Sequence, residues 1–328
     1  YAIPMYEIAL RKHNKSMLLK QIRTEGSVEE VIQFLQDGVQ KSAGPGELTS
    51  VSEILKNIFN QLETASQSEG QLTGVPSGIK AIDNITWGFQ PQRIYVLAGR
   101  PSMGKSSLAL NFFINGTLSN KRIYYHTLEE SIQSVMSRII SNFTGIPNEQ
   151  LQHGNLRKTD WQIIAENIER IKGLNFIIND TSALTSIELC RLVKKQNSKK
   201  RIDMVIIDHL QELQDEGQNR HLSISKAMTN LRVLCKELKV PVLVLCQLSR
   251  GVEATKDNYP TLAHLKESGD IEAVADVVML LYRASYYSKI SVYPDPVDIS
   301  IAKNRDGRTG QLKCLWLADQ MKFCDVEL

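Results

Sequence analysis

The sequence Gly99-Arg-Pro-Ser-Met-Gly-Lys-Ser106 directly follows the apolar run Ile94 to Ala98. It matches G-x-x-x-x-G-K-[ST], the pattern of a phosphate-binding loop (P-loop) between a strand and a helix. There, backbone N–H groups and the amino end of the helix surround the phosphates of a nucleotide. We predict that Lys105 contacts the β- and γ-phosphates of ATP or another nucleoside triphosphate, and that Ser106 is a ligand of Mg²⁺. The predicted nucleotide-binding residues are Gly99, Arg100, Pro101, Ser102, Met103, Gly104, Lys105, Ser106 and Ser107.

Around this loop, short apolar runs alternate with helical stretches over residues 71 to 328. Such alternation predicts an α/β domain with a mostly parallel, twisted sheet between helices. The predicted strands are residues 94–98, 122–127, 175–178, 204–207, 242–246, 277–282, 297–302 and 312–317. The predicted helices include residues 105–118, 159–172 and 185–196.

Polar side chains follow three of the predicted strands. Asp208 ends one of them, where a carboxylate typically holds Mg²⁺ directly or through water. Glu129 and Glu130 follow another, and either carboxylate can polarise an attacking water molecule, so chemistry does not choose between them. Gln247 follows a third, where its amide either hydrogen-bonds the γ-phosphate or is simply solvated.

The composition is that of an ordinary globular protein of about two domains. The 328 residues are 42 % apolar and 23 % charged, and the net charge of +3 excludes a broad basic coat. The five cysteines form no C-x-x-C pair, which indicates a reducing compartment and no zinc site. The longest apolar runs are too short for a membrane helix, and no signal peptide is recognisable. We therefore expect a cytoplasmic protein with no membrane partner.

The amino-terminal part has a different organisation. Residues 1 to 42 are predicted to be helical, with a capping box at Ser27-Val-Glu-Glu30, and residues 43 to 70 to form a hinge and a linker helix. The linker helix carries one apolar stripe, made of Val51, Ile54, Leu55, Ile58, Phe59 and Leu62. Such a short helix must dock, either on its own chain or on a neighbouring copy. Because the first residue is Tyr1, we expect that an amino-terminal piece is missing.

Taken together, the P-loop and five further blocks resemble the RecA-like motor domain of replicative DNA helicases of the DnaB family. The resemblance covers about residues 71 to 328 and implies that residues 1 to 42 are the end of an amino-terminal helical domain. It implies Glu129 rather than Glu130 as the base. The further blocks are Thr127-Leu-Glu129, Asp208-His-Leu-Gln211, Gln247-Leu-Ser-Arg250, Leu265-Lys-Glu-Ser-Gly-Asp-Ile-Glu272 and Ala302-Lys-Asn-Arg-Asp-Gly-Arg-Thr-Gly310.

In the last block, Lys303 and Arg305 precede a turn with two glycines, Gly307 and Gly310. Alone, these residues would be a solvated hairpin tip, but the resemblance implies that Arg305 is an arginine finger for a neighbouring subunit, with Lys303 beside it. The implied DNA-binding residues are Lys266, Glu267, Gly269, Arg250 and Arg220. Lys266 replaces the family's usual Arg, which keeps the charge but loses the fork geometry. His209 replaces its usual Tyr.

We therefore predict a replicative DNA helicase, active as a homo-hexamer that translocates on single-stranded DNA and separates strands at replication forks. The resemblance implies ATP and Mg²⁺ as cofactors and a primase and a helicase loader as partners. The pattern is compatible with a bacterial or a phage source. The alternative is a RecA-type recombination or repair ATPase, against which the linker helix and the Lys303/Arg305 hairpin stand. A third hypothesis is an ATP-binding scaffold that only recruits a primase.

Overall fold

The computed structural model describes residues 72 to 326, apart from 216–219, 256, 289 and 291 and the side chains of 266–268. The predicted helical segment 1–42 and the linker 43–70 lie outside the described residues. The described residues belong to one compact unit that begins at Gly70. The helices described in that unit are too short or too polar to cross a bilayer.

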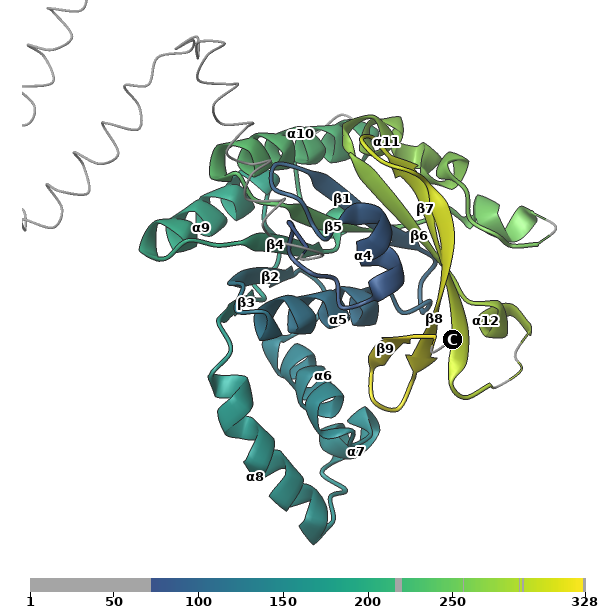
Figure 1. Ribbon diagram of the computed structural model, residues 1–328. Helices are drawn as coiled ribbons and strands as arrows, with labels where there is room; N and C mark the ends of the chain where they lie inside the picture. The colour runs from purple at the N-terminus through teal and green to yellow at the C-terminus, as the bar shows by residue number, and fades with distance from the viewer. Residues whose placement is uncertain (1–71, 216–219, 256, 289, 291, 327–328) are drawn as a thin grey trace, which may run out of the picture. The chain divides into compact units, whose positions relative to one another are not determined.

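A nine-stranded sheet organises the described part of the chain (Figure 1), in the order β3-β2-β4-β5-β1-β6-β7-β8-β9. The first six strands in this order pair in parallel, and β7, β8 and β9 continue the sheet antiparallel. The strands are β1 (Ile94–Gly99), β2 (Ile123–Thr127), β3 (Phe176–Asn179), β4 (Met204–Asp208), β5 (Val242–Gln247), β6 (Val277–Tyr282), β7 (Asp295–Asn304), β8 (Gly310–Leu317) and β9 (Lys322–Asp325).

Helices cover both faces of the sheet. One face is covered by α4 (Lys80–Thr86), α5 (Lys105–Leu118), α6 (Ile132–Thr144) and α8 (Lys158–Lys172), with α7 (Asn148–His153) packed on α6. The other is covered by α9 (Ser186–Lys199), α10 (Arg220–Leu238) and α11 (Gly269–Val274). The short helix α12 (Ala284–Ser288) and the 3₁₀ turns η1 (Leu210–Glu212), η2 (Arg250–Ala254) and η3 (Leu262–Ser268) complete the described elements.

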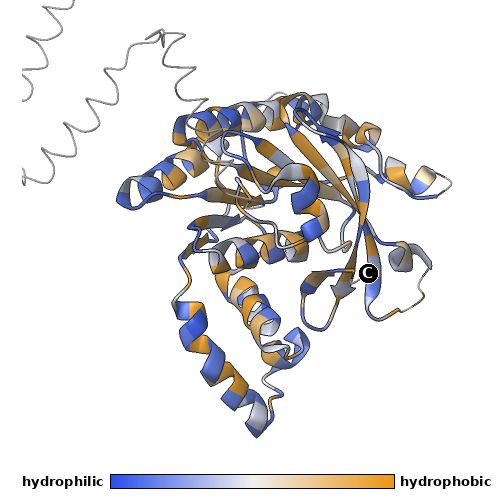
Figure 2. Ribbon diagram, viewed as in Figure 1, coloured by the Kyte–Doolittle hydropathy of each residue, from blue (hydrophilic) through white to orange (hydrophobic). Residues whose placement is uncertain are grey.

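The central strands are buried on both sides, which explains their continuous apolar sequences. Successive side chains of a strand point to opposite faces. In β1, Tyr95 and Leu97 join the core beneath α5, whereas Val96 and Ala98 join the core beneath α10. Figure 2 shows these strands in orange between helices with one polar face. The two cores hold the carboxyl ends of β1, β2, β4 and β5 at one edge, where ligands of such sheets bind.

The predicted α/β architecture is confirmed, and each strand and helix predicted within the described residues has a counterpart in the structure. Arg220, one of the implied DNA-binding residues, lies on a helix. It is the first residue of α10, because apolar side chains at helical spacing bury that segment against the sheet. These side chains are Ile224, Ala227, Met228, Leu231, Leu234 and Cys235.

Candidate nucleotide-hydrolysis site

The P-loop joins the end of β1 to the start of α5. Gly104 lies just before the helix with a φ of +98°, a backbone conformation that strongly favours glycine. Lys105 is buried, and its Nζ donates to the carbonyl oxygen of Arg100 at 3.2 Å. Burial lowers the pKa of Lys105, and the nearby charges of Asp208 and Glu129 oppose that shift. The cation therefore lies inside the loop, facing the carboxylates that end β4 and follow β2.

Other P-loop side chains tie the loop to the rest of the domain. The Arg100 guanidinium contacts the Glu253 carboxylate at 2.7 Å and donates to the carbonyl oxygen of Leu248 at 2.9 Å. Arg283 donates to the carbonyl oxygen of Ser102 at 3.2 Å. Met103 is buried in the core beneath the loop. These contacts fix the shape of a loop whose ligand-binding groups are backbone N–H groups.

Asp208, at the end of β4, is buried beside the P-loop. Its Oδ2 accepts a hydrogen bond of 2.8 Å from the hydroxyl of Tyr125, which lies in the adjacent strand β2. Burial and the Asp208 charge raise the pKa of Tyr125 well above its usual value, so its hydroxyl remains a donor. Tyr125 orients Asp208, a role that sequence analysis missed because the tyrosine resembles any other core residue of a strand.

The two candidate glutamates after β2 have different surroundings. Glu130 pairs with Arg138 at 2.8 Å and accepts a hydrogen bond from the Ser134 hydroxyl. Both partners belong to helix α6, so this helix holds the Glu130 carboxylate in place. Burial, the largest effect, raises the pKa of Glu130. The Glu129 side chain is 66 % exposed at the sheet edge and lies 3.5 Å from His209. Of the two carboxylates, Glu129 is therefore the one that no cation of helix α6 neutralises and that is more open to solvent.

A polar cluster connects the ends of β4 and β5. Nε2 of His209 lies 2.7 Å from the Gln247 side-chain amide, with donor and acceptor roles that depend on the tautomer. The Gln211 side chain accepts from the Gln247 backbone N–H at 3.2 Å and donates to its carbonyl at 3.4 Å. Sequence analysis assigned no role to His209, yet this histidine lies between the candidate base Glu129 and Gln247.

Lys303 and Arg305 lie at the edge of the sheet where the parallel strands β1 and β6 begin. The P-loop lies at the opposite edge, where β1 ends. β7 runs antiparallel to β6, so its end lies beside Asp276 at the start of β6 and near the start of β1. The P-loop follows the end of β1, about 17 Å away along that strand. The two cations are therefore not part of the P-loop site of their own chain. We call residues 303–310 the finger hairpin.

A family model described as the DnaB-like helicase C-terminal domain matches residues 74–325. This chain belongs to the DnaB-like helicase family. It is 32 % identical to the replicative DNA helicase DnaB of Geobacillus stearothermophilus, over 95 % of this chain and 73 % of that protein. It is 30 % identical to the replicative DNA helicase DnaC of Bacillus subtilis, with the same coverage of both chains.

Two solved structures share the fold of this DnaB-like helicase. One, described as an ATPase domain, has a TM-score of 0.79 and 31 % identity, and the match covers 85 % of this chain and 99 % of that domain. The other, a DnaB-like replicative helicase described with its interactions with primase, has a TM-score of 0.81 and 28 % identity, covering 95 % and 74 % of the chains. The predicted resemblance is confirmed, and the chain is an ATP-dependent replicative DNA helicase. The RecA-type alternative is not favoured.

The residues of this DnaB-like helicase fit a Mg²⁺ ion that is held partly by a nucleotide. Among the described residues, no group of three His, Cys, Asp or Glu side chains forms a cage for a metal. Mg²⁺ usually binds one or two protein oxygens together with phosphates and water, rather than a cage of protein ligands. Buried Asp208 and the hydroxyl of Ser106, in the first turn of α5, supply such oxygens beside the P-loop.

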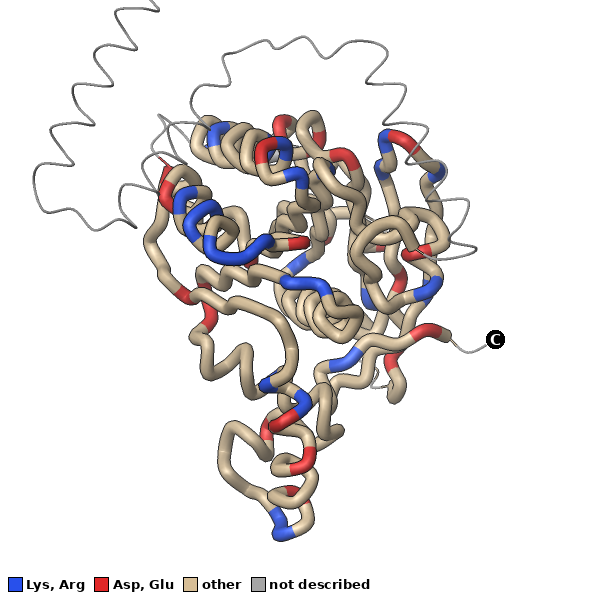
Figure 3. The backbone as a smooth tube through the Cα atoms, turned by 60° about the vertical axis from the view of Figure 1, so that its left-hand side comes forward, with Lys and Arg blue, Asp and Glu red and all other residues tan. Residues whose placement is uncertain are grey.

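The candidate DNA-binding residues of this DnaB-like helicase are only partly described. Arg250 is exposed at the start of η2, Arg220 lies 3.5 Å from the carbonyl oxygen of Gln211, and Gly269 is exposed at the start of α11. The side chains of Lys266 and Glu267 lie outside the described part of the structure. Figure 3 shows basic and acidic segments interspersed along the backbone, as the small net charge leads one to expect.

Proposed function

We propose that this DnaB-like helicase works as a ring of six copies that hydrolyses ATP between subunits, translocates on single-stranded DNA and opens the duplex at the replication fork. The position of Lys303 and Arg305 carries the proposal. Both are exposed or partly exposed at the edge of the sheet away from their own P-loop. A neighbouring copy that places its P-loop against this edge brings the cations to its own γ-phosphate. Such a finger contributes about 10³ to 10⁵ in rate.

Each residue of the P-loop edge has a role in this proposal. Lys105 and the loop N–H groups bind the phosphates, Glu129 orients and polarises the attacking water, and Gln247 contacts the γ-phosphate. Ser106 and Asp208 are the residues that would hold Mg²⁺. When bound, the ion neutralises negative charge on the β- and γ-phosphate oxygens. Gln247 then connects hydrolysis to the segment after β5, where Arg250 lies.

DNA binding in this proposal uses the phosphate backbone rather than the bases. Arg220, Arg250, Lys266 and the backbone N–H groups of Glu267 and Gly269 would contact phosphates in a central channel, with sequence-tolerant tracking as the result. Residues 43–70 would pack on a neighbouring copy and hold the ring together. A primase and a helicase loader are the proposed protein partners, and the cytoplasm is the proposed compartment.

A pair of glutamate variants tests the proposed hydrolysis mechanism. We expect Glu129→Gln to lower the ATP hydrolysis rate by about 10² to 10⁴, because an amide cannot act as the base. Unwinding of a forked substrate should be lost, whereas binding of a fluorescent ATP analogue should be retained. Glu130→Gln is the matched control, because Glu130 is already paired with Arg138.

The two variants separate the competing hypotheses. Normal fork unwinding by Glu129→Gln would refute the proposed motor, and pairing of homologous strands without unwinding would favour the strand-exchange alternative. A larger loss of hydrolysis in Glu130→Gln than in Glu129→Gln would transfer the role of the base to Glu130.

A further inference from the structure

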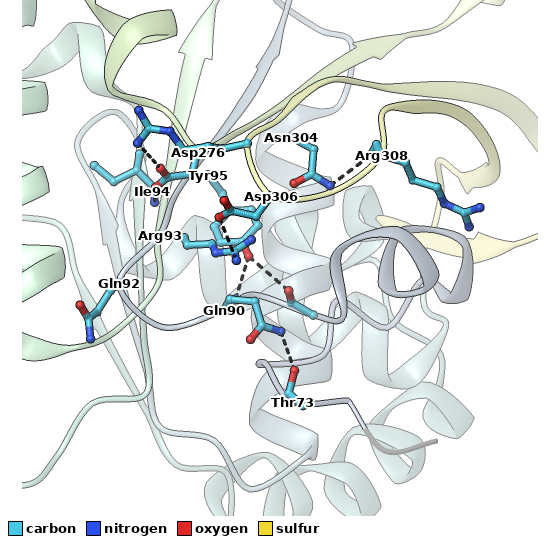
Figure 4. Close-up of polar contacts among 12 residues, drawn as sticks. Thr73, Gln90, Gln92, Arg93, Ile94, Tyr95, Asp276, Asn304, Asp306 and Arg308 are labelled. Carbon is cyan, nitrogen blue, oxygen red and sulfur yellow. Dashed lines mark hydrogen bonds and ion pairs between the residues drawn. The ribbon is translucent and has the colours of Figure 1, made fainter. Parts of the chain in front are cut away.

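Asp276 is a buried carboxylate that joins three elements at the edge of the sheet that carries the finger hairpin (Figure 4). Its Oδ2 accepts a hydrogen bond of 2.8 Å from the backbone N–H of Ile94, at the start of β1. The same oxygen contacts the Arg232 guanidinium of α10 at 2.7 Å. Its Oδ1 lies 3.3 Å from the Arg305 guanidinium. The Asp276 side chain is 6 % exposed, whereas that of Arg305 is 60 % exposed. A buried carboxylate thus holds the Arg305 guanidinium, while most of the arginine side chain remains exposed to solvent.

The backbone of Asp276 also forms a hydrogen bond with Arg305. The backbone N–H of Arg305 donates to the carbonyl oxygen of Asp276 at 2.9 Å. Four residues before Asp276, the carbonyl oxygen of Glu272 accepts a hydrogen bond of 2.6 Å from Nζ of Lys303. Lys303 and Arg305 are therefore both fixed to one short segment, residues 272–276. A long side chain that is already ordered loses less conformational entropy when it binds a ligand.

The electrostatics of the junction keep Asp276 charged. Burial raises the pKa of Asp276, but the hydrogen bonds from Arg232 and Ile94 and the charge of Arg305 outweigh it and leave the pKa below its usual value. Arg232 also donates to the carbonyl oxygen of Val274, which fixes its partly buried guanidinium. Two guanidinium groups thus share one carboxylate, and the Arg305 side chain, at 60 % exposed, is much more open to solvent than that of Arg232, at 19 %.

The tip of the finger hairpin has a contrasting contact. Asp306 pairs with Arg93 at 3.0 Å, but both side chains are substantially exposed (Figure 4). An exposed pair of this kind contributes little to stability or orientation. The Arg93–Asp306 pair therefore offers a control on the same hairpin.

We propose that Asp276 is the positioning residue of Arg305, which it orients at the sheet edge so that the guanidinium meets the γ-phosphate of a nucleotide bound by a neighbouring copy. The inference rests on the proposed role of Arg305 as a finger in trans. Orientation matters because a displacement of about 1 Å at a reacting group costs about 10² in rate. Asp276 contacts no reacting atom and acts only through Arg305.

The test compares Asp276→Asn, Arg305→Ala and the double variant in the full chain, by steady-state ATP hydrolysis with saturating single-stranded DNA. We expect Arg305→Ala to lower kcat by about 10³ or more and Asp276→Asn by about 10². The KM for ATP and the affinity for a fluorescent ATP analogue should change little, because an arginine finger stabilises charge that develops in the transition state. In the Arg305→Ala background, Asp276→Asn should cause no further loss.

Controls separate positioning from a general loss of structure. Asp306→Asn, which breaks only the exposed pair with Arg93, should leave kcat within a few-fold. Thermal unfolding and circular dichroism report whether Asp276→Asn folds. If it does not fold, the double variant Arg232→Met/Asp276→Asn removes both charges of the buried pair together, a change that proteins often tolerate. It should show the same loss of kcat.

Different results would contradict the role of Asp276 and the role of Arg305. A normal kcat in folded Asp276→Asn would overturn the inference, and so would losses in Asp276→Asn and Arg305→Ala that multiply in the double variant, because Asp276 would then act independently of Arg305. A normal kcat in Arg305→Ala would instead overturn the finger itself, and with it the proposed interface site.

Discussion

The buried hydroxyl of Tyr125 contacts Asp208, which we propose as a ligand of Mg²⁺. It donates to Asp208 from the neighbouring strand, and groups of this kind typically change metal affinity 10- to 100-fold. We expect Tyr125→Phe to raise the Mg²⁺ concentration for half-maximal ATP hydrolysis about tenfold, measured by Mg²⁺ titration at saturating ATP. Tyr124→Phe is the matched control, because Tyr124 contacts His126 on the other face of the same strand. Equal shifts in both variants would show that Tyr125 has no specific role in metal binding.

The backbone conformation of Gly104 can be tested for its contribution to nucleotide binding by the P-loop. A Cβ at this position would lie 3.2 Å from the Phe323 ring, at a φ of +98°. We expect Gly104→Ala to weaken nucleotide binding at least tenfold, measured with a fluorescent ATP analogue, because the loop must change shape to accept the methyl group. Gly154→Ala has a similar positive φ and nothing within 4 Å, far from the P-loop in sequence. It should bind nucleotide normally, and a similar loss in both variants would contradict this explanation.

At the scale of strands and helices, the buried thiols of the sheet predict that the fold becomes less stable at alkaline pH. Burial raises the pKa of Cys246 in β5 and of Cys314 in β8 from 9.0 to about 12. Between these values the unfolded chain has lost protons that the folded chain keeps, so the free energy of unfolding falls as pH rises. We expect Cys246→Ala to reduce the fall in Tm between pH 9.0 and about 12. Half-buried Cys324 supplies the control, Cys324→Ala, and an unchanged slope in Cys246→Ala would refute the thiol contribution.

The parallel strands were predictable because they are buried on both faces and therefore have continuous apolar sequences. β9 was not predicted, because only Phe323 of its four residues is buried and its pairing with β8 supplies the rest of its stability. The P-loop residues were recognisable from local spacing alone. The contacts of Tyr125 with Asp208 and of His209 with Gln247 depend on the order β2-β4-β5, which the sequence does not contain.

For the protein as a whole, the small net charge and the position of the finger hairpin both indicate that activity depends on assembly. A charge of +3 over 328 residues does not provide a broad surface for DNA, and one chain does not bring Arg305 to its own P-loop. In the proposed ring, both functions become effective when several copies meet around a channel, where a few cations and backbone N–H groups per copy are concentrated. Activity is therefore expected to depend on assembly.

This dependence can be measured as the rate of ATP hydrolysis per subunit across protein concentration, with and without single-stranded DNA, with light scattering on the same samples. We expect a low rate at concentrations where the protein is monomeric. The rate should rise as hexamers form, and a further stimulation by DNA should occur only in the assembled state. A rate per subunit that is high in the monomer and independent of both concentration and DNA would contradict the proposed interface site.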